Sequence, residues 1–169
     1  MALPFYILFA ERDLNAGLKM VGVYAVVQSL GKVLGGPIWG WLSDHAGPTV
    51  GLRAVAVSVF AIPLVALTAQ WGSPAPLLAV FALIGAVQDG VWMVGSNTLL
   101  ASVSSEERPL AVGVSSLLQA PGALFGVIGG ALAAATSYPV VFAAAALFGG
   151  AAVIMTWRME AGAAETAGD

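Results

Sequence analysis

The sequence contains no cysteine, a single histidine and few charged residues. Of its 169 residues, six are Lys or Arg and nine are Asp or Glu, which is 9% of the chain. The absence of cysteine excludes disulfides, and a single histidine argues against a Cys/His metal site. The net charge of −3 argues against nucleic-acid binding, because six scattered basic residues cannot form a stripe that neutralises phosphates. We therefore expect no metal, no cofactor and no nucleic-acid partner.

Catalytic patterns are also missing. The serines have no histidine base near them within any apolar segment, and the carboxylates do not pair at one level. No glycine-rich loop followed by lysine is present to hold a phosphate, so the sequence gives no support for an ATP-driven mechanism. The sequence predicts a protein that is not an enzyme.

Apolar residues are abundant. They make up 59% of the chain and give a mean hydropathy of +0.92, which leaves too little polar surface for a soluble domain. A bilayer core of about 30 Å needs roughly 20 apolar residues per helix, and runs of that length mark membrane spans. Five such runs lie at about 17–42, 52–71, 75–101, 109–135 and 138–157.

The spans are predicted to be helices. Lipid-exposed sheet edges would leave backbone groups unpaired, and the runs do not alternate as barrel strands do. Their short connections require neighbouring helices to pack antiparallel. We predict an all-α integral membrane bundle over residues 11–158, with five full transmembrane helices. Residues 1–10 are expected to be a truncated transmembrane helix, and 159–169 a disordered polar tail.

The basic residues fall into two groups along the chain. Arg53, Arg108 and Arg158 would lie on one side of a membrane, and Arg12 and Lys19 on the other. Because cytoplasmic loops are enriched in Lys and Arg, we expect the first group to lie in the cytoplasm. This predicts a multi-pass protein of the cell membrane with a cytoplasmic C-terminus.

A loop motif follows the first full span. Gly40 and Asp44 lie one helical turn apart, so the glycine lets another helix approach on the face that carries the carboxylate. Asp44 is near the negative end of its helix dipole and needs a partner outside its own helix, such as another helix N-terminus or a basic side chain. Gly47 completes the motif. A polar turn that merely caps two helices is the alternative.

These three residues resemble the G-x-x-x-D-R/K-x-G-R/K-R/K loop motif of the major facilitator superfamily. The sequence departs from that motif at His45, where a permanent cation is usual, and at Pro48-Thr49, which replace the basic pair.

The resemblance covers nearly the whole chain and implies a specific architecture. The truncated helix at residues 1–10 corresponds to the end of helix seven of the family, and the five spans correspond to helices eight to twelve. Together they form an MFS-type half bundle. It implies as partners the lipid bilayer, a small-molecule substrate and a missing N-terminal half of the same transporter. It also implies that Gly40, Asp44 and Gly47 form a latch at a cytoplasmic gate.

Two charged residues lie inside apolar spans. Lys32 is twelve residues from Asp44, about 18 Å at the helical rise, and Asp89 is about 20 Å from either end of its span. Both are expected near the midplane, where an unpaired charge costs a few kcal/mol and needs a partner or a water-filled cavity. They form either a pair that couples a proton to transport or a permanent structural ion pair.

Other polar residues keep helical register with these two charges. They occur on the first, third and fourth spans, which correspond to the cavity-lining helices of the family, whereas the second and fifth spans are nearly featureless. We expect Lys32 and Asp89 to carry proton coupling. The residues predicted to line the pathway with them are Tyr24, Gln28, Gln88, Trp92, Asn97, Ser116 and Gln119.

Taken together, these features predict secondary active transport of a small solute by alternating access, coupled to protons. A non-transporting membrane subunit or assembly protein is one alternative, and a small half-transporter that dimerises is another. If the protein transports, Lys32 and Asp89 should face a shared polar cleft. If it does not, they should be sealed in a dry helix contact.

Overall fold

The chain forms a bundle of long helices. The computed structural model describes residues 3–101 and 103–166, and every regular element in these ranges is helical. The elements are α1 (Leu3–Arg12), α2 (Leu18–Ala46), α3 (Pro48–Thr68), η1 (Ala69–Trp71), α4 (Ala75–Ala101), α5 (Arg108–Gln119), η2 (Ala120–Ala123), α6 (Leu124–Ala135) and α7 (Tyr138–Thr166).

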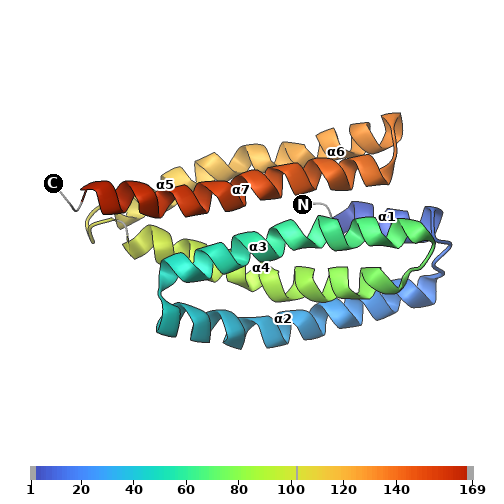
Figure 1. The fold of residues 1–169 in the computed structure, drawn as a ribbon, viewed down its shortest axis with the longest axis horizontal. Coiled ribbons are helices and arrows are strands. Elements are labelled where there is room, and N and C mark those ends of the chain that lie inside the picture. The colour runs from blue at the N-terminus through green and yellow to red at the C-terminus, as the bar shows by residue number, and fades with distance from the viewer. Residues whose placement is uncertain (1–2, 102, 167–169) are drawn as a thin grey trace.

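Five helical segments are long and apolar enough to cross a membrane, which confirms the predicted all-α membrane fold. They are α2, α3 continued by η1, α4, the segment from α5 to α6, and α7. The helices alternate in direction, so the α2–α3 turn, the α4–α5 connection and the end of α7 gather at one end of the bundle (Figure 1). The other connections lie at the opposite end.

The helix ends differ from the sequence prediction at two places. The first full span was expected to end at Leu42, but α2 continues to Ala46, and only Gly47 separates it from α3. Gly47 has φ 85°, a left-handed conformation that glycine adopts at little cost, and proline at the start of α3 has a preset helical φ.

The polar tail was expected to be disordered, yet α7 continues through Thr166. Alanine, methionine and glutamate favour helix strongly, which explains the extension. Two parts of these predictions lie outside the described residues: 167–169 of the tail and 1–2 of the truncated N-terminal helix.

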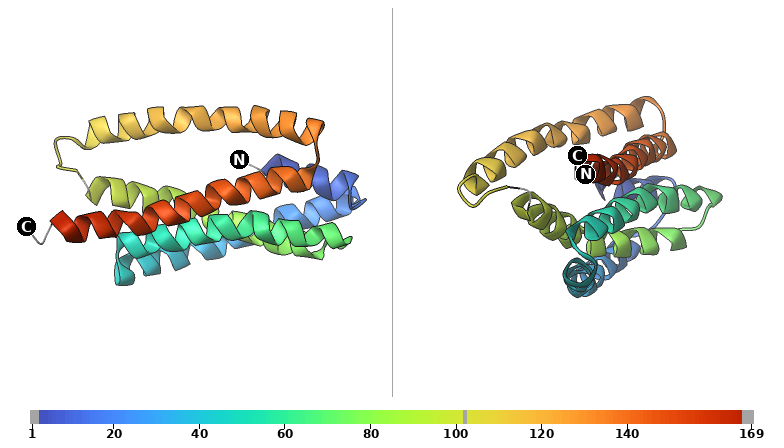
Figure 2. Two further views of the ribbon diagram at one scale, coloured as in Figure 1. Left: turned by 45° about the horizontal axis from the view of Figure 1, so that its top comes forward. Right: turned by 60° about the vertical axis from the view of Figure 1, so that its left-hand side comes forward.

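A short 3₁₀ segment interrupts the fourth span. Residues Ala120–Ala123 include Pro121, which has no backbone N–H to continue the α-helical ladder, so the helix changes to η2 before α6 resumes. The span bows away from the other helices (Figure 2). Among its described residues none of α5 or α6 is buried.

The closest contact between two helices joins α2 and α4. A Cβ at Gly31 or Gly35 would overlap the backbone of Ala82 or Ala86 on α4, and a Cβ at Gly85 would overlap the Gln28 carbonyl on α2. Three glycines therefore bring the two backbones together. Such small-residue contacts favour helix association in lipid, where apolar side chains gain little by leaving the solvent.

Aromatic side chains are prominent in the buried core at the α1 end of the bundle. Tyr6 of α1 stacks on Phe142 of α7 with ring centroids 4.8 Å apart, and Phe9 meets the same ring edge-on at 5.4 Å. Tyr24 of α2 stacks on Phe81 of α4 at 4.7 Å. These contacts join α1, α2, α4 and α7 through one cluster.

Many large apolar side chains remain on the outside. Leu118, Val127, Leu147 and Phe148 are all between 69% and 77% exposed. A soluble monomer rarely shows so much contiguous apolar surface, whereas a bilayer solvates it.

We predict that Gly35→Leu lowers the free energy of unfolding by on the order of 2 kcal/mol, because the new side chain cannot fit against the Ala86 backbone. Gly36→Leu is the matched control, since a Cβ at Gly36 meets nothing within 4 Å. Denaturation of the purified protein in detergent, followed by circular dichroism, measures both. An equal loss in the two variants would contradict the close α2–α4 contact.

Candidate functional site

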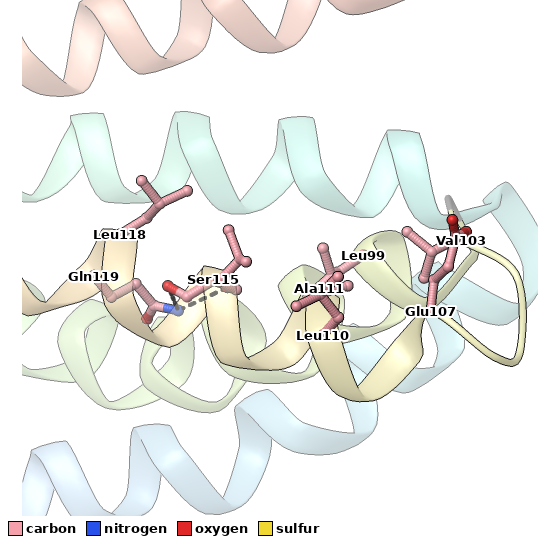
Figure 3. Close-up of a pocket in the computed structure, with 9 residues that line it drawn as sticks. Leu99, Val103, Glu107, Leu110, Ala111, Ser115, Leu118 and Gln119 are labelled. Atoms are coloured by element: carbon pink, nitrogen blue, oxygen red, sulfur yellow. Dashed lines mark hydrogen bonds between the residues drawn. The ribbon is translucent and has the colours of Figure 1, made fainter.

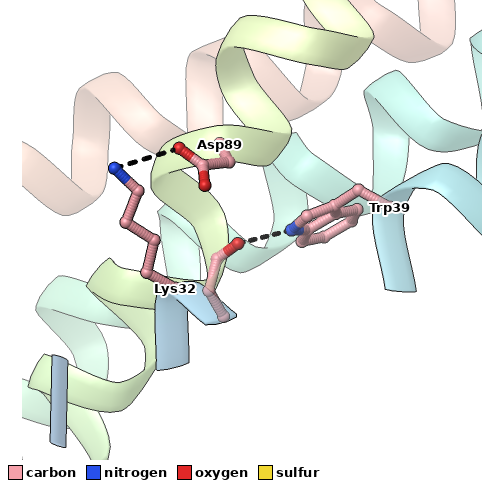
Figure 4. Close-up of polar contacts among 4 residues, drawn as sticks. Lys32, Trp39 and Asp89 are labelled. Atoms are coloured by element: carbon pink, nitrogen blue, oxygen red, sulfur yellow. Dashed lines mark hydrogen bonds and ion pairs between the residues drawn. The ribbon is translucent and has the colours of Figure 1, made fainter. Parts of the chain in front are cut away.

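The two intramembrane charges form an ion pair between α2 and α4. Lys32 Nζ lies 3.5 Å from Asp89 Oδ1 (Figure 4). The side chains are 52% and 44% exposed, so the pair lies at the surface of this bundle rather than sealed between its helices. A pair at this position satisfies both charges within the apolar span while leaving them open to a further ligand.

The α2–α4 contact brings the two charges together. The helices run parallel, and residues at a constant offset along the chain meet turn after turn: Tyr24 meets Phe81, Gln28 meets Gly85 and Lys32 meets Asp89. Asp89 has a short side chain, so the approach of the α4 backbone at Gly85 brings its carboxylate within reach of Lys32.

Two side chains of α2 that carry polar groups are buried: Tyr24, which was predicted to line the pathway, and Trp39. Tyr24 is 1% exposed, and its hydroxyl donates to the Pro74 carbonyl at 3.3 Å. Trp39 is 6% exposed, and its indole N–H donates to the Ala86 carbonyl at 2.5 Å. These side chains hold α2 on α4 and do not share the exposed face with Lys32.

The other predicted pathway residues are at least partly exposed. Gln28 on α2 is half-buried, whereas Gln88, Trp92 and Asn97 on α4 are exposed. On α5, Ser116 and Gln119 are exposed and satisfy their polar groups locally. Ser116 Oγ donates to the Val112 carbonyl at 2.9 Å, and Gln119 Nε2 donates to Ser115 Oγ at 3.1 Å. Within the described ranges, α5 makes no hydrogen bond or ion pair with Lys32 or Asp89.

A pocket of about 540 Å³ lies along α5, apart from the ion pair (Figure 3). Its wall is mostly apolar and polar only near Glu107, Ser115 and Gln119. Glu107 accepts a hydrogen bond from Ser104 Oγ at 2.8 Å. Of the predicted pathway residues, Gln119 lines it. The lining residues are Leu99, Val103, Glu107, Leu110, Ala111, Val114, Ser115, Leu118 and Gln119.

The loop-motif residues lie at the end of the bundle that carries the α2–α3 turn. Gly40 faces Met93 of α4, whose Cε would be 4.0 Å from a Cβ at that position. Asp44 is exposed and makes no hydrogen bond or ion pair within the described ranges. Gly47 is the turn residue with positive φ. The structure therefore gives Gly47 a backbone role and leaves Asp44 available to a partner.

The sequence comparison decides the family. A family model described as the Major Facilitator Superfamily matches residues 1–167. The chain belongs to the major facilitator superfamily. No curated protein and no solved structure matches it. The superfamily consists of membrane transporters, so the chain is a membrane transporter protein.

Within this major facilitator chain, two contacts had not been predicted from the sequence. One is the hydrogen bond from Trp39 to Ala86, because its partner is a backbone carbonyl on a helix distant in sequence. The other is a cation–π contact, in which the Arg53 guanidinium lies 5.5 Å from the centroid of the Trp157 ring. Among the described residues no cluster of three or more His, Cys, Asp or Glu is placed to hold a metal ion.

Proposed function

We propose that this protein performs secondary active transport of a small solute by alternating access, with proton coupling at Lys32 and Asp89. The observation that carries the proposal is the 3.5 Å ion pair, half exposed in the apolar part of a major facilitator chain. A charged pair inside a membrane span faces the interior of the whole bundle or a water-filled cavity, because lipid does not solvate it. Its exposure supports a site that a solute or a proton can reach.

The coupling would follow from the charge balance of the pair. A proton that binds the Asp89 carboxylate removes its charge, so the Lys32 ammonium loses its partner inside the span. The unpaired ammonium then needs another anionic or polar group, which a bound solute can supply. Proton binding and solute binding would thereby depend on each other.

The proposed solute pathway follows the exposed faces of α2, α4 and α5. Gln28, Gln88, Trp92 and Asn97 would provide polar and aromatic contacts beside the pair, and Ser116 and Gln119 would contribute from α5. Tyr24 is buried against Phe81, so we assign it to supporting α2.

We further propose that this bundle forms one half of the transporter and that a second six-helix half covers the exposed α2–α4 face. Rocking of the two halves would then expose the pair to each side of the membrane in turn. The protein would lie in the cell membrane with its C-terminus in the cytoplasm. Arg53 and Arg108 follow the two helices that end at the same end of the bundle, which supports this orientation (Figure 1).

The proposal predicts solute-dependent proton movement in liposomes. Purified protein would be reconstituted with internal pyranine and tested under a pH gradient with a panel of organic acids, sugars and cationic drugs. At least one compound should change the internal pH faster than in protein-free liposomes. Asp89→Asn should reduce this flux to the protein-free level, because the amide cannot take up the proton.

Glu106→Gln makes the same chemical change on an exposed connection and should keep the full flux. If Asp89→Asn retains the pH dependence of the parent, Asp89 is not the coupling residue.

Asp44 is proposed to act with Gly40 and Gly47 as the latch of a cytoplasmic gate. Because its carboxylate is exposed at a helix end, it can accept a contact from the second half in one state and release it in the other. Asp44→Ala should lower the transport rate about threefold, the scale of one charge at a helix terminus, without changing membrane insertion. Asp13→Ala, an exposed carboxylate at the opposite end, is the control. Equal transport rates for the two variants would show that Asp44 has no role in a gate.

A further inference from the structure

Trp39 contacts the turn of α4 that carries Asp89. Its indole N–H donates to the carbonyl of Ala86, three residues before Asp89, at 2.5 Å (Figure 4). Its ring lies over Gly90, the residue after Asp89, where a Cβ would come within 2.6 Å of Nε1. One side chain on α2 therefore contacts α4 three residues before and one residue after Asp89.

The contact fixes α4 without disturbing its backbone ladder. A helix carbonyl has a second lone pair, so the Ala86 oxygen can accept from the indole and still accept from its own helix. The indole N–H needs such a partner, because an unmet donor in an apolar span is costly. Val55 of α3 and Val87 and Val94 of α4 pack in the same buried cluster with Trp39.

The glycine contact and the Trp39 contact constrain different motions. Gly31, Gly35 and Gly85 set the distance between the two helix axes, because a larger residue at any of them would force the backbones apart. They do little to prevent α4 from rotating about its own axis. The Trp39 ring on Gly90 extends that line of contact by one turn, to the turn of α4 that carries Asp89, and the directional hydrogen bond to the Ala86 carbonyl opposes such a rotation.

We propose that Trp39 is a positioning residue for the Lys32–Asp89 pair. It holds the Ala86–Gly90 turn of α4 in the rotation that directs the Asp89 carboxylate towards Lys32 Nζ. The short aspartate side chain cannot follow a rotated helix, whereas the long lysine can, so the position of the carboxylate is the one that requires support. The consequence for transport rests on the proposed function above, but the effect on geometry does not.

The geometric test uses two nitroxide labels. The chain has no cysteine, so Val33→Cys on α2 and Val91→Cys on α4, both exposed, provide a labelled pair in liposomes. Trp39→Phe keeps an aromatic ring but loses the N–H. Gly90→Ala adds a methyl group where the Trp39 ring packs on Gly90. Both should broaden or shift the distance distribution measured by electron paramagnetic resonance.

Trp41→Phe is the matched control, because Trp41 lies on the same helix, is 63% exposed and stacks on His45 rather than on α4. It should leave the distribution unchanged. An unchanged distribution in both Trp39→Phe and Gly90→Ala would overturn the proposal.

The functional test compares two fluxes of the same solute through the protein: uptake driven by a pH gradient, and downhill efflux without one. Trp39→Phe should lower the ratio of the first to the second about threefold, the scale of one lost hydrogen bond between membrane helices. A merely structural role would reduce both fluxes together, so an unchanged ratio would refute the positioning role. If the parent protein shows no pH-driven uptake, the proposed function fails, and the nitroxide distances alone decide the role of Trp39.

Discussion

The backbone contact between α2 and α4 is the constraint on which the rest of the site depends. In a bilayer, two helices gain little by exchanging lipid for apolar side chains, so association relies on close packing and on hydrogen bonds between helices. Gly31, Gly35 and Gly85 allow that packing because they have no side chain at the points where the two backbones meet. The resulting parallel register brings a lysine and an aspartate, far apart in sequence, to the same level.

The remaining helices support this pair in different ways. α3 connects α2 to α4 and packs against α7 on the other side, which gives α2 and α4 a fixed backing. The segment from α5 to α6 stands apart, because Pro121 interrupts its helix and no described residue in α5 or α6 is buried. The ion pair therefore lies on the firmly packed part of the bundle.

The number and type of the spans could be predicted from the sequence, because hydropathy and helix length are local properties. The helix ends were less predictable: Ser43, Asp44 and His45 mark a polar end of the membrane span, yet a helix can continue through polar residues to Ala46. The pairing of Lys32 with Asp89 was predicted only from their similar depth in the membrane, near the midplane of their spans. The contacts that position these two residues could be predicted only in part. A glycine pair such as Gly31 and Gly35 indicates close packing but does not identify the partner helix. Trp39 donates to a backbone carbonyl, which any residue could provide, so its partner has no signal in the sequence.

If a solute pathway passes the ion pair, the α2–α4 face around the pair is open to water within the membrane. Since the chain lacks cysteine, single cysteines at Gln28 and Gln88 can be tested in liposomes with a membrane-impermeant thiol reagent, with exposed Leu147 on α7 as the lipid-facing reference. We expect Gln28→Cys and Gln88→Cys to react readily and Leu147→Cys not to react. If all three positions are equally unreactive, the face is buried in lipid or protein, and no solute pathway passes the pair.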